Sequence, residues 1–175
     1  IKGGLYSGSQ FLELSHVSNS ADIYFTNDGS IPNRNSQLYS APIEITFSKV
    51  IRAKAYEQNH LPSAVCTESF FIDEPTSLPI VSLAMNHDEL WHFNFGIFKN
   101  SLKNRKIGSS VEFFKQGEKQ FGLNAGMKIF GTTIFQLDQK PMSFELSSKY
   151  GDELLEYPLF RNKNLRSVEN FLLRN

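Results

Sequence analysis

Apolar and polar residues alternate in short runs through the first part of the chain. In residues 22–26, Ile23 and Phe25 can face one side while the residues between them face the other. This period of two is typical of a half-buried strand. The runs that we expect to form strands are 8–16, 22–26, 43–47, 50–57 and 65–72. Several short strands with regular turn signals and no helical period predict an antiparallel β-sandwich.

A tight turn follows the second of these runs, in the stretch ADIYFTNDGSIPN. Asp28 and Gly29 supply the left-handed backbone positions that such a turn requires. Pro32 then prevents the chain from continuing as a regular strand, because proline has no N–H to give to a neighbouring strand. We therefore predict a strand that ends in a turn at this point.

The pattern changes beyond residues 74–79, a short stretch with two prolines that we interpret as a linker. After it we expect a buried strand at 80–85, a short helix at 86–91, a polar loop at 100–110 and strands at 111–114, 125–130 and 142–148. The pattern leaves the type of the apolar segments 157–160 and 168–175 open. Of the 16 phenylalanines, 11 lie in this second half, which indicates a core of its own. The prediction is two β-rich domains, 1–73 and 80–175.

Composition and charge exclude some classes of function. The 18 basic residues balance the 18 acidic ones, which argues against a dedicated nucleic-acid-binding protein. Cys66 is the single cysteine, so neither an intrachain disulfide nor a cysteine-based metal site can form. No apolar run approaches the roughly 20 residues that span a bilayer. Because the chain begins at Ile1 without a methionine and stops within an apolar run, we expect it to be a fragment of a longer protein.

Specific residues of the first part follow the pattern of a known module. They comprise an opening Gly-Gly, the turn described above, a Tyr-x-x-Pro segment, a Lys-Ala strand and a Pro-Ser. The matching residues are Gly3, Gly4, Tyr24, Thr26, Asp28, Gly29, Ser30, Pro32, Tyr39, Pro42, Ala53, Lys54, Ala55, Pro62 and Ser63. Over about the first seventy residues the chain resembles the chitobiase/β-hexosaminidase C-terminal domain, also called the fibronectin type III-associated domain. The resemblance implies an immunoglobulin-like sandwich that accompanies exported bacterial enzymes and surface proteins and has no catalytic chemistry of its own.

The second half contains two longer stretches with a resemblance of their own, LPIVSLAMNHDELWHFNFGIF and SVEFFKQGEKQFGLNAGMKIFG. With DQKPMSFEL, YPLF and FLLRN they are similar, in order, to the beginning of the spore coat protein H-like (CotH) kinase family. The resemblance implies an atypical kinase fold that binds ATP and a divalent metal such as Mg²⁺ and transfers phosphate to protein. The acidic catalytic and metal-binding residues of that family follow the region matched here. We therefore expect a partial, β-rich α+β kinase-like lobe, with no catalytic residue and no metal ligand in this chain.

The resemblance also implies a cofactor site. Lys140 matches the lysine of the family's Gln-Lys-Ser segment, where it would hold nucleotide phosphates as a point charge. Gln139 lies beside it, and Gly131 opens a stretch in which small residues would let backbone amides approach phosphate. We predict these three residues as the cofactor-binding set of the parent protein, with ATP and Mg²⁺ as its cofactors and none bound by this chain alone.

Departures from the family pattern leave an alternative open. Phe130 stands where the family has histidine, and Ile134 and Phe135 occupy the region where an arginine is expected. An apolar pair lowers the charge complementarity of a phosphate-facing loop. The alternative is a degenerate kinase-like portion in a non-catalytic surface protein that binds carbohydrate or protein.

Three further clusters have a structural and a functional interpretation, and we favour the structural one for each. A basic run could bind an anion but is more typical of a solvated loop. Aromatic residues could form a sugar-stacking platform but are more typical of core and edge packing. His87 and His92 are five positions apart, so on a helix they do not converge on a metal. The residues of the first two clusters are Lys99, Lys103, Arg105 and Lys106, and Tyr6, Tyr24, Tyr39, Tyr56 and Trp91.

Together these observations predict a fragment of an exported or cell-surface bacterial protein that is not catalytic as an isolated chain. It pairs an accessory sandwich with part of a CotH-like kinase domain. The expected partners are a protein or a cell-surface polysaccharide. We expect no nucleic-acid partner and no membrane span in this chain.

Overall fold

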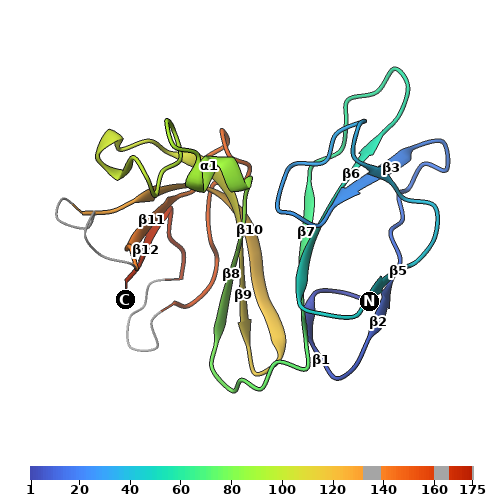
Figure 1. Cartoon of the computed structure of the whole chain (residues 1–175), viewed down its shortest axis with the longest axis horizontal. Helices are drawn as coiled ribbons and strands as arrows, with labels where there is room; N and C mark the ends of the chain where they lie inside the picture. The colour runs from blue at the N-terminus through green and yellow to red at the C-terminus, as the bar shows by residue number, and fades with distance from the viewer. Residues whose placement is uncertain (132–138, 160–165, 175) are drawn as a thin grey trace. The chain divides into compact units, whose positions relative to one another are not determined.

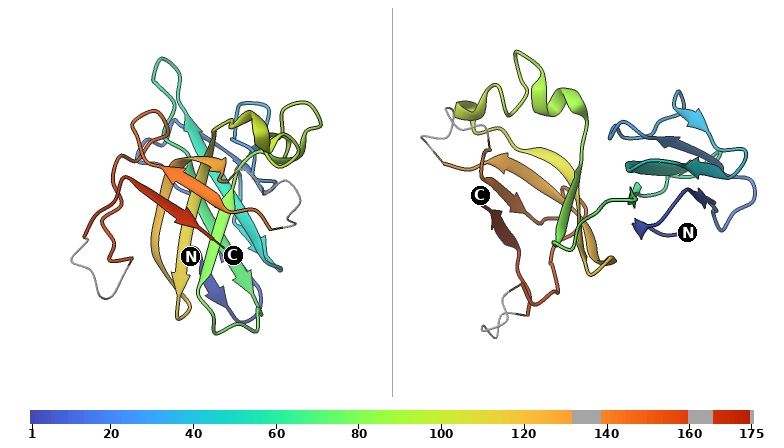
Figure 2. Two further views of the ribbon diagram at one scale, coloured as in Figure 1. Left: turned by 90° about the vertical axis from the view of Figure 1, so that its left-hand side faces the viewer. Right: turned by 60° about the horizontal axis from the view of Figure 1, so that its bottom comes forward.

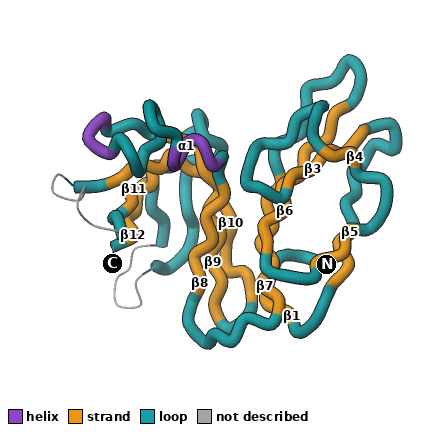
Figure 3. The backbone as a smooth tube through the Cα atoms, viewed as in Figure 1, coloured by secondary structure: helices purple, strands orange, loops and turns teal. Residues whose placement is uncertain are grey.

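The computed structural model describes residues 1–131, 139–159 and 166–174. Strands dominate these residues, with only two short helical segments among them (Figure 3). The prediction of a mainly β chain is therefore confirmed. The chain divides into two compact units: unit 1 comprises 1–86 and 112–120, and unit 2 comprises 87–111 and 121–175. The boundaries that the sequence suggests, at 73 and 80, stay a prediction.

Unit 1 contains a five-stranded sheet with the order β1-β7-β6-β3-β4 (Figure 1). Strand β1 runs parallel to β7, and the other neighbours are antiparallel. The strands are β1 (Gly4–Tyr6), β7 (Cys66–Ile72), β6 (Lys49–Tyr56), β3 (Asp22–Thr26) and β4 (Gln37–Leu38). A second, two-stranded sheet pairs β2 (Gln10–Leu12) with β5 (Ile43–Ile45) in antiparallel fashion.

Apolar residues from both sheets form one core, as in a β-sandwich. Phe25 of β3 and Ile51 of β6 are 6% and 3% exposed, and each belongs to the face that the alternation predicts. Leu12 and Ile45 of the small sheet and Phe70 and Ile72 of β7 complete the cluster. The period-two pattern thus placed the core correctly, since alternate side chains of a strand point to the same face.

The sequence missed two strands of the large sheet and overestimated the length of one strand of the small sheet. Strand β1 has three residues and β4 has two, which is too short for a period of two to be visible. The strand expected at 8–16 is limited to Gln10–Leu12, where the pairing with β5 extends over three residues. Tertiary pairing, rather than local pattern, sets these boundaries.

The other five-stranded sheet has the order β12-β11-β10-β9-β8. Its strands are β8 (Ile80–Ala84), β9 (Ile107–Lys115), β10 (Glu118–Ile129), β11 (Met142–Glu145) and β12 (Asn170–Leu173). Strands β9 and β10 form a long hairpin, drawn from yellow to light orange in Figures 1 and 2. Gln116 and Gly117, both with positive φ (55° and 84°), make its turn.

The hairpin is longer than the sequence predicted, and the predicted loop at 100–110 was wrong over its last residues. Strand β9 starts at Ile107, so Ser109 and Ser110 lie within it. Their hydroxyl groups donate to the carbonyl of Ala125 (3.1 Å) and to Asn124 Oδ1 (2.7 Å) on the same chain. Small polar residues resemble a loop in sequence, but here a partner strand satisfies their hydrogen bonds. A 3₁₀ turn, η1 (Ser101–Lys103), forms in the part that remains outside the strand.

Unit 2 has its own buried apolar residues, as the phenylalanine distribution predicts. Met127 of β10 lies opposite Phe144 of β11, both with 0% exposure. Phe144 stacks on Phe171 of β12 with ring centroids 4.9 Å apart. Strand β12 thereby assigns half of the segment that the sequence left open at 168–175. The short helix α1 (His87–Trp91) lies in the region where one was predicted.

Candidate functional site

The predicted cofactor residues lie at one end of the β10–β11 pair. The pairing of these strands ends at Ile129 and Met142, and the next residue, Phe130, donates its N–H to the Pro141 carbonyl at 2.9 Å. Gly131 follows with a φ of 110°, a conformation that favours glycine. Lys140 is half-buried, while Gln139 and Gly131 are exposed. Residues 132–138, with Ile134 and Phe135, lie outside the described residues.

Because the hydrogen bond between Phe130 and Pro141 extends the ladder, Gly131 and Lys140 flank the same hairpin end. The two residues are therefore neighbours at this end, as the sequence interpretation requires. The role in nucleotide binding stays a prediction.

Most basic residues of the run after α1 bind other groups of unit 2. Arg105 pairs with Glu89 at 2.5 Å, and Lys106 pairs with Glu145. The hydrogen bond from Lys106 lowers the pKa of Glu145 below its ordinary value. Lys103 donates to a backbone carbonyl at 2.9 Å. These cations therefore act on groups of the chain itself, in line with the structural interpretation.

The tyrosines of the sandwich pack against the fold. Tyr6 stacks on Phe70 with ring centroids 6.4 Å apart, and Tyr39 packs against the core. Tyr24 and Tyr56 meet edge to face at 5.7 Å. They do not form one common platform, because Tyr6 and Tyr39 contact the core whereas Tyr24 and Tyr56 contact each other.

The signature turn after β3 is fixed by its own side chains. Asp28 accepts hydrogen bonds from the backbone N–H (2.9 Å) and the hydroxyl (2.6 Å) of Ser30. The hydroxyl and the N–H of Ser30 together lower the pKa of the Asp28 carboxyl. Thr26 Oγ1 donates to the Ser30 carbonyl at 2.7 Å, which closes the turn. The Asp28 carboxylate therefore stabilises the turn.

Gly29 lies where the backbone of the turn approaches another segment of unit 1. Its φ is 82°, and a Cβ at this position would stand 2.5 Å from the carbonyl oxygen of Met85. Arg52, only 5% exposed, donates from its guanidinium to the Gly29 carbonyl at 2.8 Å. Burial holds the pKa of Arg52 below its ordinary value. Glycine is thus required here by conformation and by space together.

A buried polar network, which the sequence analysis missed, lies elsewhere in unit 1. Ser69 Oγ donates to Glu112 Oε2 at 2.5 Å. Since this bond uses the single hydroxyl hydrogen of Ser69, Ser82 must be the donor in the 2.7 Å contact between the two serines. Lys119 Nζ donates to Glu112 Oε1 at 3.0 Å and to Glu68 Oε1 at 2.7 Å. The chain of contacts thus joins β7, β8, β9 and β10.

Glu112 is the most enclosed charge of this network, at 2% exposure. Burial raises the pKa of its carboxyl, while the hydrogen bonds from Ser69 and Lys119 act in the opposite direction. Burial alone would lower the pKa of Lys119, but its bonds to Glu68 and Glu112 leave that pKa above its ordinary value. Ser69, at 1% exposure, and Glu112 are enclosed, and the partly exposed Lys119 and Glu68 are paired with each other, so we interpret the network as structural. The one sequence signal was a glutamate inside the apolar strand VEFF.

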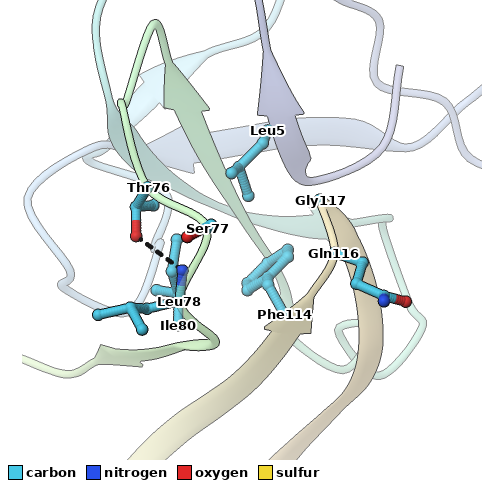
Figure 4. Close-up of a pocket in the computed structure, with 8 residues that line it drawn as sticks. All are labelled: Leu5, Thr76, Ser77, Leu78, Ile80, Phe114, Gln116 and Gly117. Carbon is cyan, nitrogen blue, oxygen red and sulfur yellow. Dashed lines mark hydrogen bonds between the residues drawn. The ribbon is translucent and has the colours of Figure 1, made fainter.

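A pocket of about 280 Å³ lies beside the turn of the β9–β10 hairpin, also within unit 1 (Figure 4). Phe114, Leu5 and Ile80 give it apolar walls. Its polar rim includes Thr76, whose Oγ1 accepts the N–H of Leu78 at 3.1 Å. Ligand pockets usually start near 300 Å³, so this one is too small for a nucleotide. None of the predicted cofactor residues lines it.

Comparisons with known proteins support the first part of the sequence interpretation. No curated protein and no solved structure matched the chain. Among the described residues, no helix is long and apolar enough to cross a membrane. Residues 1–67 match the family model of the chitobiase/beta-hexosaminidase C-terminal domain, which confirms the resemblance that the signature residues predicted for this part of the chain.

Proposed function

We propose that this chain is a non-catalytic, carbohydrate-associated accessory part of an exported or surface-attached bacterial protein. In it, a sandwich of the chitobiase/β-hexosaminidase C-terminal type precedes a segment similar to the beginning of a CotH-like kinase domain. The match of residues 1–67 to the family model carries the proposal. The partner that we propose is a cell-surface polysaccharide.

The structure of the signature turn supports an accessory role. Asp28, Ser30 and Gly29 are all engaged in forming and packing the turn. A general acid or base needs a carboxylate that can exchange its proton with a substrate, whereas Asp28 accepts two hydrogen bonds from Ser30. The residues that define the family in this chain therefore build a scaffold.

The accessory role is tested by retention on insoluble polysaccharides. We expect the whole chain to be retained on at least one of chitin, cellulose and peptidoglycan, and a heat-denatured sample of the same protein to lose this specificity. Depletion from the supernatant at increasing polymer concentration measures the affinity. Equal depletion on an inert resin, or none on any polymer, contradicts the carbohydrate association.

The kinase-like segment is proposed to contribute to a nucleotide site in the parent protein. Lys140 and Gly131 lie at one hairpin end, and a lysine with a glycine backbone is a combination that suits a phosphate group. ATP would bring the phosphates to this end, and Gln139 would lie beside them. No metal ligand is assigned, because no three described His, Cys, Asp or Glu residues are grouped to hold an ion.

Substitution of Lys140 tests the proposed nucleotide site. If the chain binds ATP with Mg²⁺ in a calorimetric titration, Lys140→Ala should weaken binding by roughly tenfold or more, the value of a lost charge-assisted hydrogen bond. Lys99→Ala removes an equal charge elsewhere in the second half and should leave binding unchanged. Binding that survives Lys140→Ala would show that the phosphate contact is misplaced.

One observation favours the alternative, an inactive kinase-like portion in a surface-binding protein. Phe130 replaces the histidine of the family pattern, and its ring, 39% exposed, lies 6.0 Å from the Arg174 guanidinium. An arginine over an aromatic face is a stable packing arrangement that does not involve phosphate. Under this alternative the polysaccharide assay is positive and the parent protein does not bind ATP.

A further inference from the structure

A second pocket of unit 1 lies directly beside the signature turn, with a volume of about 290 Å³. It is bounded by β3, β4, the segment after β4 and the start of β6. The residues that line it are Phe25, Asn27, Gln37, Leu38, Ser40, Ala41, Pro42, Ile43, Lys49 and Ile51. At this size it holds one small ring and is below the usual range for larger ligands.

Two of the stretches that carry the family resemblance meet at this pocket. Asn27 comes from the signature turn, and Pro42 with Ser40 comes from the Tyr-x-x-Pro segment. Tyr39 of that segment donates its N–H to the Ile23 carbonyl at 2.8 Å, which holds the segment against β3. The two motif stretches thus supply part of the wall of this pocket, through Pro42 and through Asn27 and Ser40 at variable positions of the pattern.

The lining combines an apolar base with polar groups. Phe25 and Ile51 are core residues, so they form a fixed apolar surface. Asn27 and Gln37 each offer an amide donor and an amide acceptor, and Ser40 offers a hydroxyl. A pyranose ring has the matching chemistry, with C–H groups on its faces and hydroxyl groups around its edge.

Lys49 gives the pocket a charge preference. Among the residues that the structure describes, no carboxylate forms an ion pair with it. Its ammonium lies 3.9 Å from the ring centroid of Phe47, whose side chain is 62% exposed. A half-buried lysine held at a pocket by an aromatic ring can bind the carboxylate of a ligand through a charge-assisted hydrogen bond.

We infer that this pocket binds one carboxylate-bearing pyranose unit, of the uronic-acid class, in an acidic glycan. The apolar base takes the face of the ring, the amides and Ser40 take its hydroxyls, and Lys49 takes its carboxylate. The inference rests on the proposed carbohydrate association and adds to it a site and a chemical class of ligand.

Amide chemical shifts of the whole, isotope-labelled chain test the inference with glucuronic acid and glucose, which differ in the carboxylate. We expect glucuronic acid to shift the resonances of Asn27, Gln37 and Lys49 in a saturable manner, and glucose to bind more weakly. Lys49→Met should weaken glucuronic acid binding by roughly tenfold and leave glucose binding unchanged. Asn27→Ala and Gln37→Ala should weaken the binding of both sugars.

Lys54→Met is the matched control. It removes the same charge from the same strand, but Lys54 belongs to the opposite face of β6, where its ammonium lies 5.5 Å from the Tyr56 ring centroid. Circular dichroism and the midpoint of thermal unfolding show that each variant is folded, and the exposed Gln37 provides a second variant if Asn27→Ala disturbs the turn.

The outcomes separate this inference from the proposed function. Retention on a polysaccharide with no shift at the pocket overturns the pocket and leaves the proposed function standing. Equal affinities of Lys49→Met and the unchanged chain for glucuronic acid overturn the assigned carboxylate contact. Shifts that saturate in the unchanged chain and in Lys54→Met, and that weaken in Lys49→Met, support it.

Discussion

Replacing Lys119 with methionine should lower the free energy of unfolding by about 3 kcal/mol, the usual cost of leaving a buried charge without its partner. Lys119 contacts both Glu112 and Glu68, but only Glu112 is almost fully enclosed. Methionine keeps most of the aliphatic length, so the loss comes from the missing charge and not from a cavity. Urea unfolding followed by circular dichroism measures the effect.

At acid pH, the difference in free energy of unfolding between Lys119→Met and the unchanged chain should become smaller. In the variant, Glu112 loses the hydrogen bond and the charge that hold its pKa down, so burial raises the pKa further above 4.5. The folded state then binds a proton more readily than the unfolded state, and stability falls as the pH rises through the folded pKa. The difference between the variant and the unchanged chain should therefore be smaller at pH 4 than at pH 7. A difference that grows toward acid pH would contradict the assignment.

Two further substitutions separate the charge from other effects. Glu112→Gln in the Lys119→Met background should recover much of the stability, because a neutral amide can still accept the hydrogen bond of Ser69. Lys115→Met removes a lysine from the end of the same hairpin and should change the free energy of unfolding by less than about 0.5 kcal/mol.

Replacing Gly29 with alanine should cost roughly 3 kcal/mol, because two penalties act together. The positive φ of 82° alone costs about 1–2 kcal/mol for a residue with a Cβ. The added Cβ would also stand 2.5 Å from the Met85 carbonyl oxygen, a contact with backbone that no side-chain rotation can relieve. The midpoint of thermal unfolding of the whole chain and its urea midpoint measure the loss.

Gly117→Ala is the control that isolates the clash. Gly117 has a similar φ of 84°, but a Cβ there meets no atom within 4 Å. We expect it to cost about 1 kcal/mol from the backbone conformation alone. If both alanine variants lose the same stability, the close approach of Gly29 to Met85 is not a significant constraint.

The parts of the fold that follow from local pattern could be predicted. The faces of Phe25 and Ile51 follow from the period of two, and Gly29 has the left-handed backbone predicted for it. The same prediction for Asp28 was wrong, since Asp28 has no positive φ and instead accepts the hydrogen bonds of Ser30. The limits of β9 could not, because Ser109 and Ser110 resemble loop residues until the strand that satisfies them is known.

The sites also divide into residues that the sequence predicted and residues that it did not. Lys140 and Gly131 were named from a resemblance, and the β10–β11 pairing brings them to one end. The network of Glu112 was not predicted, because Ser69, which binds Glu112, and Glu68, which binds Lys119, lie more than forty positions earlier in the chain than those partners. A carboxylate in an apolar strand indicates that a partner must exist, but sequence spacing does not identify it.

Unit 1 is built from two separate stretches of the chain, and the ribosome produces the second of them later than the first. Strand β1 pairs with β7 near residue 70, and the unit also includes residues 112–120. Unit 1 therefore acquires its last residues only after residue 120 has left the ribosome. A nascent chain of about eighty residues would still present Phe71 and Ser69 without their later neighbours, Phe114 and Glu112, and would be exposed to chaperones and proteases during that interval.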